Sequence, residues 1–98
     1  MSAYLIGHIT VKDPDLWQVY IAGVQKSLVP FEADLVFRGQ RAAILAGEHS
    51  YDQCVVIKFA NQAAIQEWYN SEVYQGLIPT RDQAADVVIL SYESSQMG

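Results

Sequence analysis

The stretch from residue 59 to residue 81 holds the chain's best candidates for binding a small molecule. It carries the aromatic residues Trp68, Tyr69 and Tyr74, and Arg81 closes it. An arginine in a partly enclosed site can hold a carboxylate or phosphate through two parallel hydrogen bonds. Aromatic walls with a few hydroxyl groups are typical of small-molecule sites. We therefore predict that Arg81 anchors an anionic ligand and that Tyr74 and Trp68 lie beside it.

Tyr69 and, from an earlier helical segment, Tyr20 are further candidates for the wall of this pocket. Each candidate also has a structural interpretation. Arg81 could form an ion pair with Asp82, with Asp86 or with an acidic residue of a partner chain. The spacing of the aromatic residues fits a helix that packs into the core as well as it fits a pocket.

His8 is the candidate catalytic residue. It lies within an apolar run, where an imidazole could act as a general base on an acidic C–H bond or as a haem ligand. The alternative is an interior histidine with satisfied hydrogen bonds. His49 lies in a polar loop and is expected to be solvated. The two histidines are far apart in sequence with no evident third ligand, so we predict no metal site.

Cys54 is the only cysteine, which excludes an internal disulfide and favours a reducing compartment. Because it begins the apolar run of residues 54–57, a core position is favoured over a nucleophile. The sequence contains no phosphate-cradling glycine loop, no Gly-x-Ser-x-Gly motif and no Cys-x-x-Cys motif. We therefore expect no cofactor, with any chemistry taking place in a bare pocket.

Composition limits the partners of the chain. Ninety-eight residues indicate one domain, predicted over residues 1–93 with a fraying tail at 94–98. The net charge of −5, with only six Lys and Arg residues, argues against nucleic acid and acidic membranes. The N-terminal apolar run is too short to span a bilayer, so a cytoplasmic protein is expected. A hydrophobic share of 51% favours a homodimer that covers part of the apolar surface.

The first half of the chain reads as a strand followed by a helix. Residues 3–11 are rich in β-branched and aromatic residues, and the drier face, with Leu5 and Ile9, is predicted to meet the helices. The opposite face, with His8, would look toward a partner or a cavity. Asp13 and Pro14 are typical of a helix start, and Pro30 ends the helix. Its buried stripe is predicted at residues 16, 19, 20, 23, 24, 27 and 28. Trp17 and Ile21 would lie on the flank, at a protomer contact or a pocket rim.

The second half supplies the remaining strands and two helices. A hairpin is predicted from strands 34–38 and 41–46, with Gly39 taking a positive φ in the turn. Residues 53–59 form a central strand, and residues 85–92 form the last one. Asn61 and Ser71 are predicted to cap two helical segments, and Pro79 must distort or restart the second.

The resulting order, β-α-β-β-β-α-α-β, predicts an α+β fold. It is a ferredoxin-like βαββαβ sandwich with an added hairpin strand. Helices cover only one face of such a sheet. The other face is apolar here, and the sheet of an identical chain would cover it to form a dimeric α/β barrel.

The chain resembles the bacterial domain of unknown function numbered thirteen-thirty, in the dimeric α/β-barrel superfamily. The resemblance covers nearly the whole chain. It rests on Asp13-Pro14, on the apolar strand that ends at Phe59, on the run from Trp68 to Gln75 and on Arg81. Members commonly have Tyr-Gly-Gly where this chain has Phe31-Glu32-Ala33. They often carry glutamate at the position of Lys58.

The resemblance implies a homodimer whose sheets face each other, with small pockets between sheet and helices. The superfamily includes cofactor-independent monooxygenases, muconolactone isomerase and haem-using members. Our first hypothesis is a protein that binds an aromatic or carboxylated metabolite, with a cofactor-free oxidation or isomerisation if it is catalytic. In that case His8 acts as base, Arg81 as anion anchor and Tyr74 as the orienting group. The second hypothesis is a non-enzymatic dimerisation module.

Overall fold

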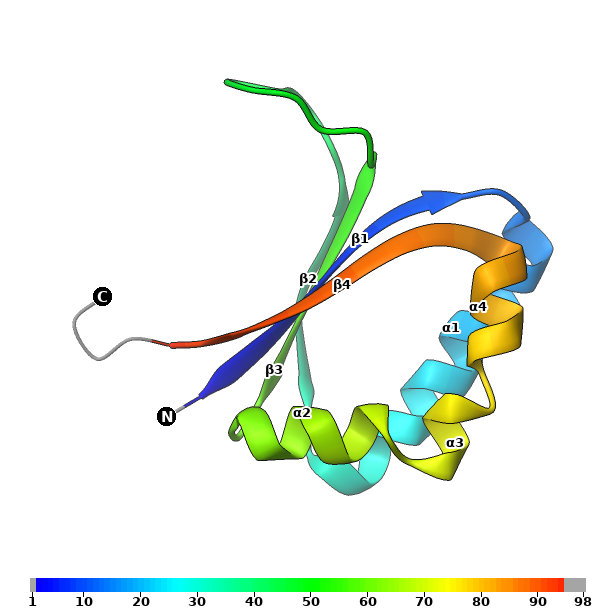
Figure 1. Cartoon of the computed structure of the whole chain (residues 1–98), viewed down its shortest axis with the longest axis vertical. Coiled ribbons are helices and arrows are strands. Elements are labelled where there is room, and N and C mark those ends of the chain that lie inside the picture. Colours follow the sequence, from blue (N-terminus) through cyan, green and yellow to red (C-terminus); the bar gives the residue numbers. More distant parts are fainter. Residues whose placement is uncertain (1, 95–98) are drawn as a thin grey trace.

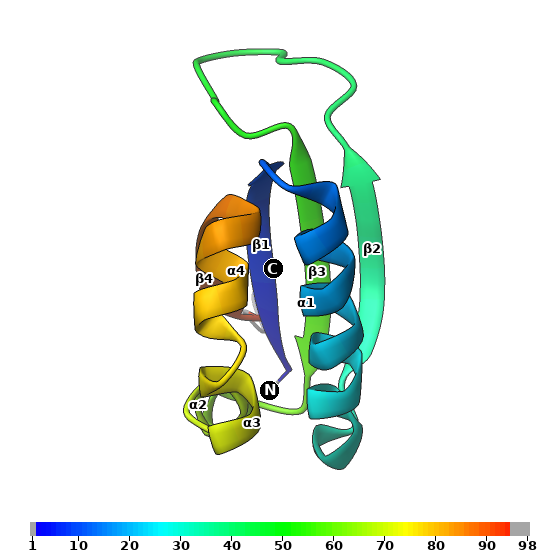
Figure 2. The ribbon, with the colours of Figure 1, turned by 90° about the vertical axis from the view of Figure 1, so that its right-hand side faces the viewer.

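Four antiparallel strands form one sheet in the computed structural model, which describes residues 2–94. The strands lie in the order β2-β3-β1-β4, and the helices cover one face of the sheet (Figures 1 and 2). This arrangement confirms the predicted α+β ferredoxin-like fold. In chain order the elements are β1 (Ala3–Val11), α1 (Pro14–Leu28), the 3-10 helix η1 (Val29–Phe31), β2 (Asp34–Gln40), β3 (Gln53–Phe59), α2 (Gln62–Tyr69), α3 (Glu72–Gln75), α4 (Ile78–Ala84) and β4 (Ala85–Glu93).

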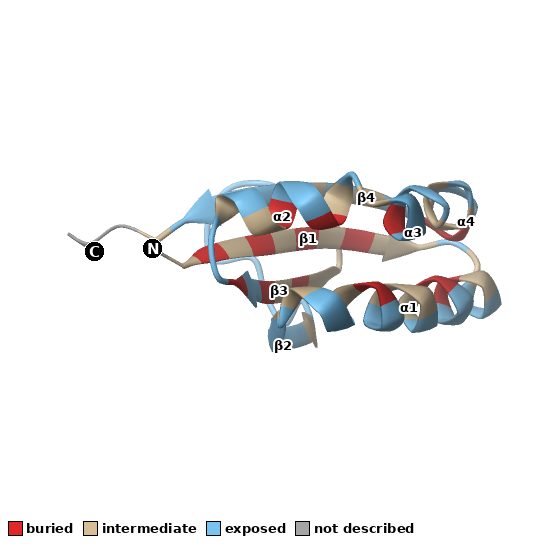
Figure 3. Cartoon of the chain, turned by 90° about the horizontal axis from the view of Figure 1, so that it is seen from below, coloured by how far each residue is buried: buried red, intermediate tan, exposed pale blue. Residues whose placement is uncertain are grey.

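The central strand β1 separates the two faces of the sheet. Its odd-numbered residues from Ala3 to Ile9 are buried under the helices, and the even-numbered residues are less buried (Figure 3). His8 is one of the latter, as the alternation of the sequence predicted. Because neighbouring strands keep this register, the helix-covered face is dry and the other face is open.

Helix α1 begins where the sequence places it and turns most of the predicted stripe to the sheet. Asp13 caps it, because one carboxylate oxygen accepts hydrogen bonds from the backbone N–H groups of Asp15 and Leu16 at 3.1 and 3.2 Å. The buried residues are Trp17, Tyr20 and Ser27. Val19, predicted to be buried, is 60% exposed. Tyr20 and Ser27 belong to the predicted stripe, and its members Leu16, Val24 and Leu28 pack against the core. The prediction was therefore wrong at Val19 and at Trp17, which is buried instead of lying on the flank.

The predicted strand 41–46 does not form. Instead, β2 continues to Gln40 and pairs with β3, so the predicted turn at Gly39 lies within a strand. The apolar pattern was not sufficient because a strand also needs a partner backbone, and β3 already pairs with β2 on this side. Gly47, rather than Gly39, takes the left-handed conformation, with φ 79°.

Residues 41–52 form a long arm that projects beyond the sheet (Figures 1 and 2). Arg41 holds its base together: the backbone N–H donates to the carbonyl of Asp52, and Nη1 donates to the carbonyls of His49 and Tyr51 at 3.0 and 2.9 Å. Leu45, in the arm, is 96% exposed. The arm is thus closed by hydrogen bonds but presents an apolar side chain to the outside.

The two ends of the described chain lie together. The backbone N–H and the hydroxyl of Ser94 both donate to the carbonyl of Ser2, at 2.9 and 3.0 Å. Ser94 was predicted to fray and is instead paired, and the rest of the predicted tail, residues 95–98, lies outside the described residues. No helix within residues 2–94 is both long and apolar enough to cross a membrane.

Candidate functional site

Four helices bring Arg81 and three tyrosines into one hydrogen-bonded group. Nη1 of Arg81, on α4, donates to the hydroxyl of Tyr74 at 3.1 Å and to that of Tyr69 at 3.3 Å. The hydroxyl of Tyr74, on α3, lies 2.8 Å from that of Tyr20, on α1. We call Arg81, Tyr69, Tyr74 and Tyr20 the arginine–tyrosine network. It joins residues up to 61 positions apart (Arg81 and Tyr20) at the junction of the helices.

Local helix signals place these side chains. Asn61 caps α2 by accepting from the N–H of Ala64 at 2.8 Å. Ser71 then turns the chain: its hydroxyl donates to the carbonyl of Trp68 at 2.7 Å and accepts from the N–H of Tyr74 at 3.2 Å. Pro79 lies in the first turn of a new helix, α4, which a proline tolerates because its missing N–H has no partner there. Of the two predicted outcomes at Pro79, the restart is the one observed.

The aromatic rings of this region pack tightly against one another. The ring centroid of Tyr74 lies 4.3 Å from that of Trp68, 5.0 Å from that of Tyr69 and 6.3 Å from that of Tyr20. Tyr74 is fully buried, and Trp68 and Tyr20 are nearly so. The indole N–H of Trp68 donates to the hydroxyl of Ser27 at 2.8 Å. These side chains are therefore held in fixed positions.

The environment of the network changes the proton affinities of its members. Burial raises the pKa of Tyr20 above its ordinary value, and the neighbouring Tyr74 raises it further. Burial alone would lower the pKa of Arg81, but its hydrogen bonds with Tyr69 and Tyr74 raise that pKa overall. The network therefore holds a charged guanidinium and a protonated Tyr20 at neutral pH.

The predicted ion pair between Arg81 and Asp82 is present. Nε of Arg81 lies 3.1 Å from a carboxylate oxygen of Asp82, and the two side chains are 13% and 61% exposed. Asp86, the other predicted partner, pairs with Lys12 at 3.5 Å. Arg81 therefore has a structural role, because its Nε and Nη1 atoms both have hydrogen-bond partners within the chain.

A cavity of about 50 Å³ lies between the sheet and the helices next to this network. Three aromatic side chains line it, from Trp17 and Tyr20 on α1 and Trp68 on α2. The rest of its wall is mostly aliphatic: Leu5, Gly7, Ile9, Ile21, Val24, Arg38, Val55, Ile57, Val87 and Ile89. Two of the predicted ligand-binding residues, Tyr20 and Trp68, therefore face the cavity. Tyr74 and Arg81 do not line it.

Arg81 instead lines an open hollow of about 490 Å³ on the outer side of the network. Thr10, Tyr51, Asp82 and Asp86 are among its other walls. The network therefore lies between an inner apolar cavity and an outer polar hollow, with Tyr20 at the inner end and Arg81 at the outer end.

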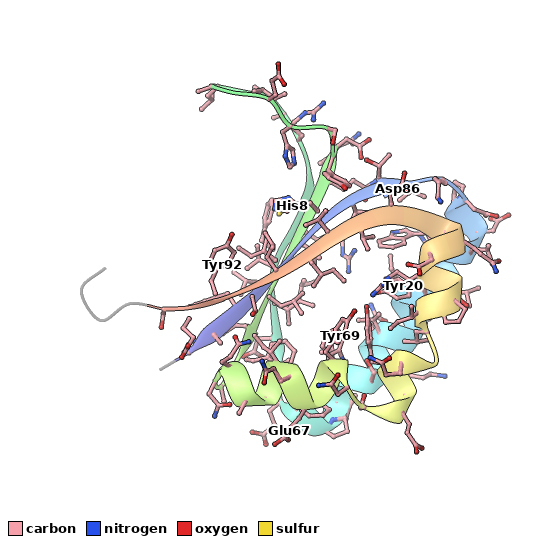
Figure 4. The ribbon with its side chains drawn as sticks, in the orientation of Figure 1. His8, Tyr20, Glu67, Tyr69, Asp86 and Tyr92 are labelled. Carbon is pink, nitrogen blue, oxygen red and sulfur yellow. The ribbon has the colours of Figure 1, made fainter. Side chains whose placement is uncertain are left out.

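His8 lies on the other face of the sheet. Figure 4 shows Tyr20 and Tyr69 between helices and sheet, while His8 and Tyr92 lie on the opposite side. The His8 ring meets that of His49 edge-on, with centroids 5.0 Å apart, below the arm. His8 and Arg81 therefore do not lie in one site. This is contrary to the predicted mechanism, in which His8 is the base and Arg81 the anion anchor of the same reaction. The error arose because strand alternation gives a residue's face but not which candidate residues share that face.

The surroundings of His8 form a second group of polar side chains. His8, His49, Tyr51 and Cys54 line an open hollow of about 500 Å³ below the arm. His49 is exposed, as predicted, but Cys54 is half-buried on the open face of the sheet rather than in the core. Among the described residues, no cluster of three or more His, Cys, Asp or Glu side chains could hold a metal ion.

Ser27 is the contributor that the sequence did not point to, because it was predicted only as a helix position. Tyr69 was predicted to belong to the pocket wall, and Trp17 was predicted on the flank of α1, at a protomer contact or a pocket rim. Tyr69 lies twelve residues before Arg81, so helical spacing could not pair them across the break between α2 and α4. A polar residue at position 27 within an otherwise apolar stripe was the available signal for Ser27.

The fold and this packed aromatic layer define a ferredoxin-like α+β protein with an apolar cavity between its layers. The sequence profile of the family described as "Domain of unknown function (DUF1330)" matches residues 2–93. The chain belongs to this family. A comparison with curated proteins finds no significant match.

Solved structures with the same fold extend over nearly the whole chain. A protein of unknown function from Rhodopseudomonas palustris, RPA0582, has a TM-score of 0.81 at 14% identity, covering 97% of this chain and 83% of that one. SnoaB, a cofactor-independent oxygenase from Streptomyces nogalater, has a TM-score of 0.66 at 10% identity, with 97% and 94% covered. A dimeric ferredoxin-like protein of unknown function from Jannaschia sp. CCS1 has a TM-score of 0.67 at 10% identity, with 96% and 100% covered. At these identities the likeness shows the fold.

Proposed function

We propose that the chain binds a small aromatic molecule in the cavity between sheet and helices. We further propose a cofactor-free oxidation or isomerisation of that molecule as the reaction class. The observation that carries the proposal is the cavity itself, which combines an aliphatic floor from the sheet with the rings of Trp17, Tyr20 and Trp68. Such a wall favours a flat, mostly apolar ligand, to which the Tyr20 hydroxyl and the Arg38 side chain offer polar contacts. The SnoaB fold shows that the same architecture can serve a cofactor-independent oxygenase.

Ligand binding must widen this cavity. Its volume of about 50 Å³ is well below the roughly 300 Å³ of common ligand sites. Ile21 and Val24 of α1 are half-buried members of its wall. Because they lie on a surface helix rather than in the sheet, their side chains can move outward with the least loss of core packing. We therefore propose that the ligand enters beneath α1.

A thermal-shift screen with a cavity-filling variant tests the proposal. The probes are aromatic acids, phenols and keto acids. A ligand that binds only the folded state stabilises it by about 2.7 kcal/mol at a hundred times its dissociation constant. Gly7→Ala places a methyl group within 3.0 Å of Val55 on the cavity wall and should weaken binding. Gly76→Ala, outside the cavity, is the matched control and should leave binding unchanged.

The two variants separate a cavity ligand from a surface ligand. A stabilising compound whose effect is lost in Gly7→Ala and kept in Gly76→Ala supports the proposal. A compound that stabilises all three proteins equally binds elsewhere and contradicts it. If no probe raises the unfolding temperature of the wild type, the cavity is ordinary packing.

A non-enzymatic homodimer is the second candidate function, and a separate observation favours it. The open face of the sheet exposes apolar side chains from two strands, including Phe37, Val88, Leu90 and Tyr92, which are 38–53% exposed. Exposed apolar surface of this kind marks an interaction site. We propose that a second copy of the chain covers this face. The dimer and the cavity lie on opposite faces, so both proposals can hold together.

A further inference from the structure

Hydrogen-bond directions in the arginine–tyrosine network follow from its chemistry. A guanidinium has only donors, so Arg81 donates to the hydroxyl oxygen of Tyr74. The proton of Tyr74 then needs an acceptor. Among the described residues, the oxygen of Tyr20, at 2.8 Å, is the only other hydrogen-bond partner of that hydroxyl. The arrangement that satisfies both groups therefore runs from Arg81 to Tyr74 to Tyr20.

With the hydrogen bonds running from Arg81 to Tyr74 to Tyr20, the hydroxyl proton of Tyr20 remains free to donate. Tyr20 accepts from Tyr74, and its own hydroxyl proton has no acceptor among the described residues. Tyr20 is also part of the cavity wall, whereas Tyr74 and Arg81 are not. Reversing the bond between the tyrosines would instead leave the proton of Tyr74 unpaired at a fully buried position, which is unfavourable.

We propose that the Tyr20 hydroxyl donates a hydrogen bond to a ligand oxygen in the cavity and that Arg81 strengthens this donor through Tyr74. The class of ligand is an aromatic molecule with an acidic O–H group, a phenol or enol, bound as its oxyanion. On binding, the O–H proton leaves to solvent and the ligand oxygen accepts from Tyr20. This inference deepens the proposed function and rests on it. Arg81 then acts as a positioning residue rather than as the direct anion anchor predicted from the sequence.

The network suits this role for two physical reasons. A charged donor at the start of a hydrogen-bonded chain polarises each bond after it, so the last hydroxyl becomes a stronger donor. The apolar cavity has a low dielectric constant, where a donor aimed at a developing oxyanion has a larger effect than in water. Burial raises the pKa of Tyr20, so the hydroxyl stays protonated, while the positive charge of Arg81 acts in the opposite direction and lowers that pKa, which is the effect expected of a group that strengthens the donor.

The test compares 4-nitrophenol with 4-nitroanisole, which has the same ring but no ionisable oxygen. Absorbance titration gives the pKa of bound 4-nitrophenol, and competition gives the affinity of 4-nitroanisole. In the wild type the bound phenol should have a pKa lowered by about one unit, a roughly tenfold preference for the oxyanion. Tyr20→Phe and Tyr74→Phe should both abolish this preference, and they should change the affinity for 4-nitroanisole far less than the affinity for the 4-nitrophenol oxyanion.

Tyr69→Phe is the matched control. Tyr69 accepts from the same guanidinium nitrogen as Tyr74 but does not connect it to Tyr20. Its loss should therefore leave the oxyanion preference intact. If Tyr74→Phe does not fold, Arg81→Gln takes its place: it removes the charge at the outer end of the chain of bonds and should reduce the preference.

The outcomes separate this inference from the proposed function. If both probes bind the wild type in the cavity but the pKa of the phenol is unshifted, the relay is wrong and the cavity site stands. A shift that survives Tyr74→Phe, or that keeps its full size in Arg81→Gln used in its place, also overturns the relay. If neither probe binds the wild type, both the relay and the aromatic-ligand site are wrong.

Discussion

The indole of Trp68 depends on a single hydroxyl for its hydrogen bond. Ser27 accepts from that N–H at 2.8 Å and donates its own proton to the carbonyl of Val24 at 2.7 Å. Because Trp68 is only 2% exposed, no water can replace Ser27 without a rearrangement. We predict that Ser27→Ala lowers the free energy of unfolding by about 1–3 kcal/mol, measured by urea denaturation.

A double-mutant cycle shows whether the lost bond is the cause. On a Trp68→Phe background there is no indole N–H to leave unpaired. There, Ser27→Ala should cost less than about 0.5 kcal/mol, since alanine is also the better helix former. Equal losses in both backgrounds would mean that Ser27 acts through packing alone.

Tyr20 gives the protein a specific sensitivity to alkali. Its pKa is raised in the folded state above the ordinary value of 10.0, so the folded protein retains a proton that the unfolded chain releases. The stabilising contribution is complete below pH 10 and decreases as the pH rises above it. The free energy of unfolding should therefore fall by about 1.4 kcal/mol per pH unit above that point.

Urea denaturation of the wild type and Tyr20→Phe across this range isolates the effect. The variant has no hydroxyl to ionise at position 20, so its stability should fall less steeply with pH than that of the wild type. Parallel curves would show that Tyr20 ionises freely in the folded protein, which the buried position argues against.

From residue type and spacing, the sequence predicted several side chains that lie together in the structure, but it did not predict their contacts. Arg81, Tyr74, Trp68 and Tyr20 were predicted from residue type and helical spacing, and the structure brings all four together. The bond between Tyr20 and Tyr74 joins positions 54 residues apart, and its partners depend on how α1 packs against α3. No periodicity contains that information. The same limit explains why His8 was combined with residues on the other face.

Among the secondary-structure elements, the turn between η1 and β2 contains a conformational strain. Glu32 has φ 52° and ψ 34°, the left-handed conformation that a side chain disfavours. We predict that Glu32→Gly raises the free energy of unfolding by about 0.5–1 kcal/mol, because relief of the strain exceeds the entropy that glycine adds to the unfolded chain.

The neighbouring residue supplies the control. Ala33 does not have a positive φ, so Ala33→Gly gains no relief and should lower stability by about 0.5–1 kcal/mol. Thermal denaturation of both variants shows whether each substitution raises or lowers the stability of the folded protein. If Glu32→Gly is destabilising, Glu32 must make a compensating contact that outweighs its backbone strain.

Element boundaries were predictable where a single side chain fixes them. Asp13, Asn61 and Ser71 each accept a backbone N–H at the start of a helix, and a helix begins at each of these positions. The strand at 41–46 was wrong because a strand is defined by its neighbour. Residues 42–45 have the right apolar character, but within the described chain they have no partner strand.

At the scale of the whole molecule, the chain is a slab of 37 × 36 × 16 Å with helices on only one side. The sequence predicted this one-sided architecture from the order of its elements and its apolar content. Val88, Leu90 and Tyr92 alternate along β4 with the residues that face the helices. Leu45 in the arm adds another exposed apolar side chain. A stable interface takes about 800 Å² from each partner, which a full face of a four-stranded sheet can supply.

The proposed dimer can be tested with one charge on the open face. Leu90 pairs in register with Ile6 of β1 and is 39% exposed, so Leu90→Lys should leave the monomer folded. In a face-to-face dimer the same lysine would be buried without a partner, which costs several kcal/mol. We predict that the wild type sediments as a dimer at micromolar concentration and that Leu90→Lys sediments as a monomer.

Val73→Lys is the matched control for that substitution. Val73 is 59% exposed on α3, on the helical side of the molecule. Replacing it with lysine also removes apolar surface and adds a charge, as Leu90→Lys does. It should leave the sedimentation of the dimer unchanged. The unfolding temperature should also rise with concentration for the wild type and Val73→Lys but not for Leu90→Lys, because association stabilises the folded state by mass action. A wild type that remains monomeric, or a Leu90→Lys variant that still dimerises, would show that the open face is not the interface.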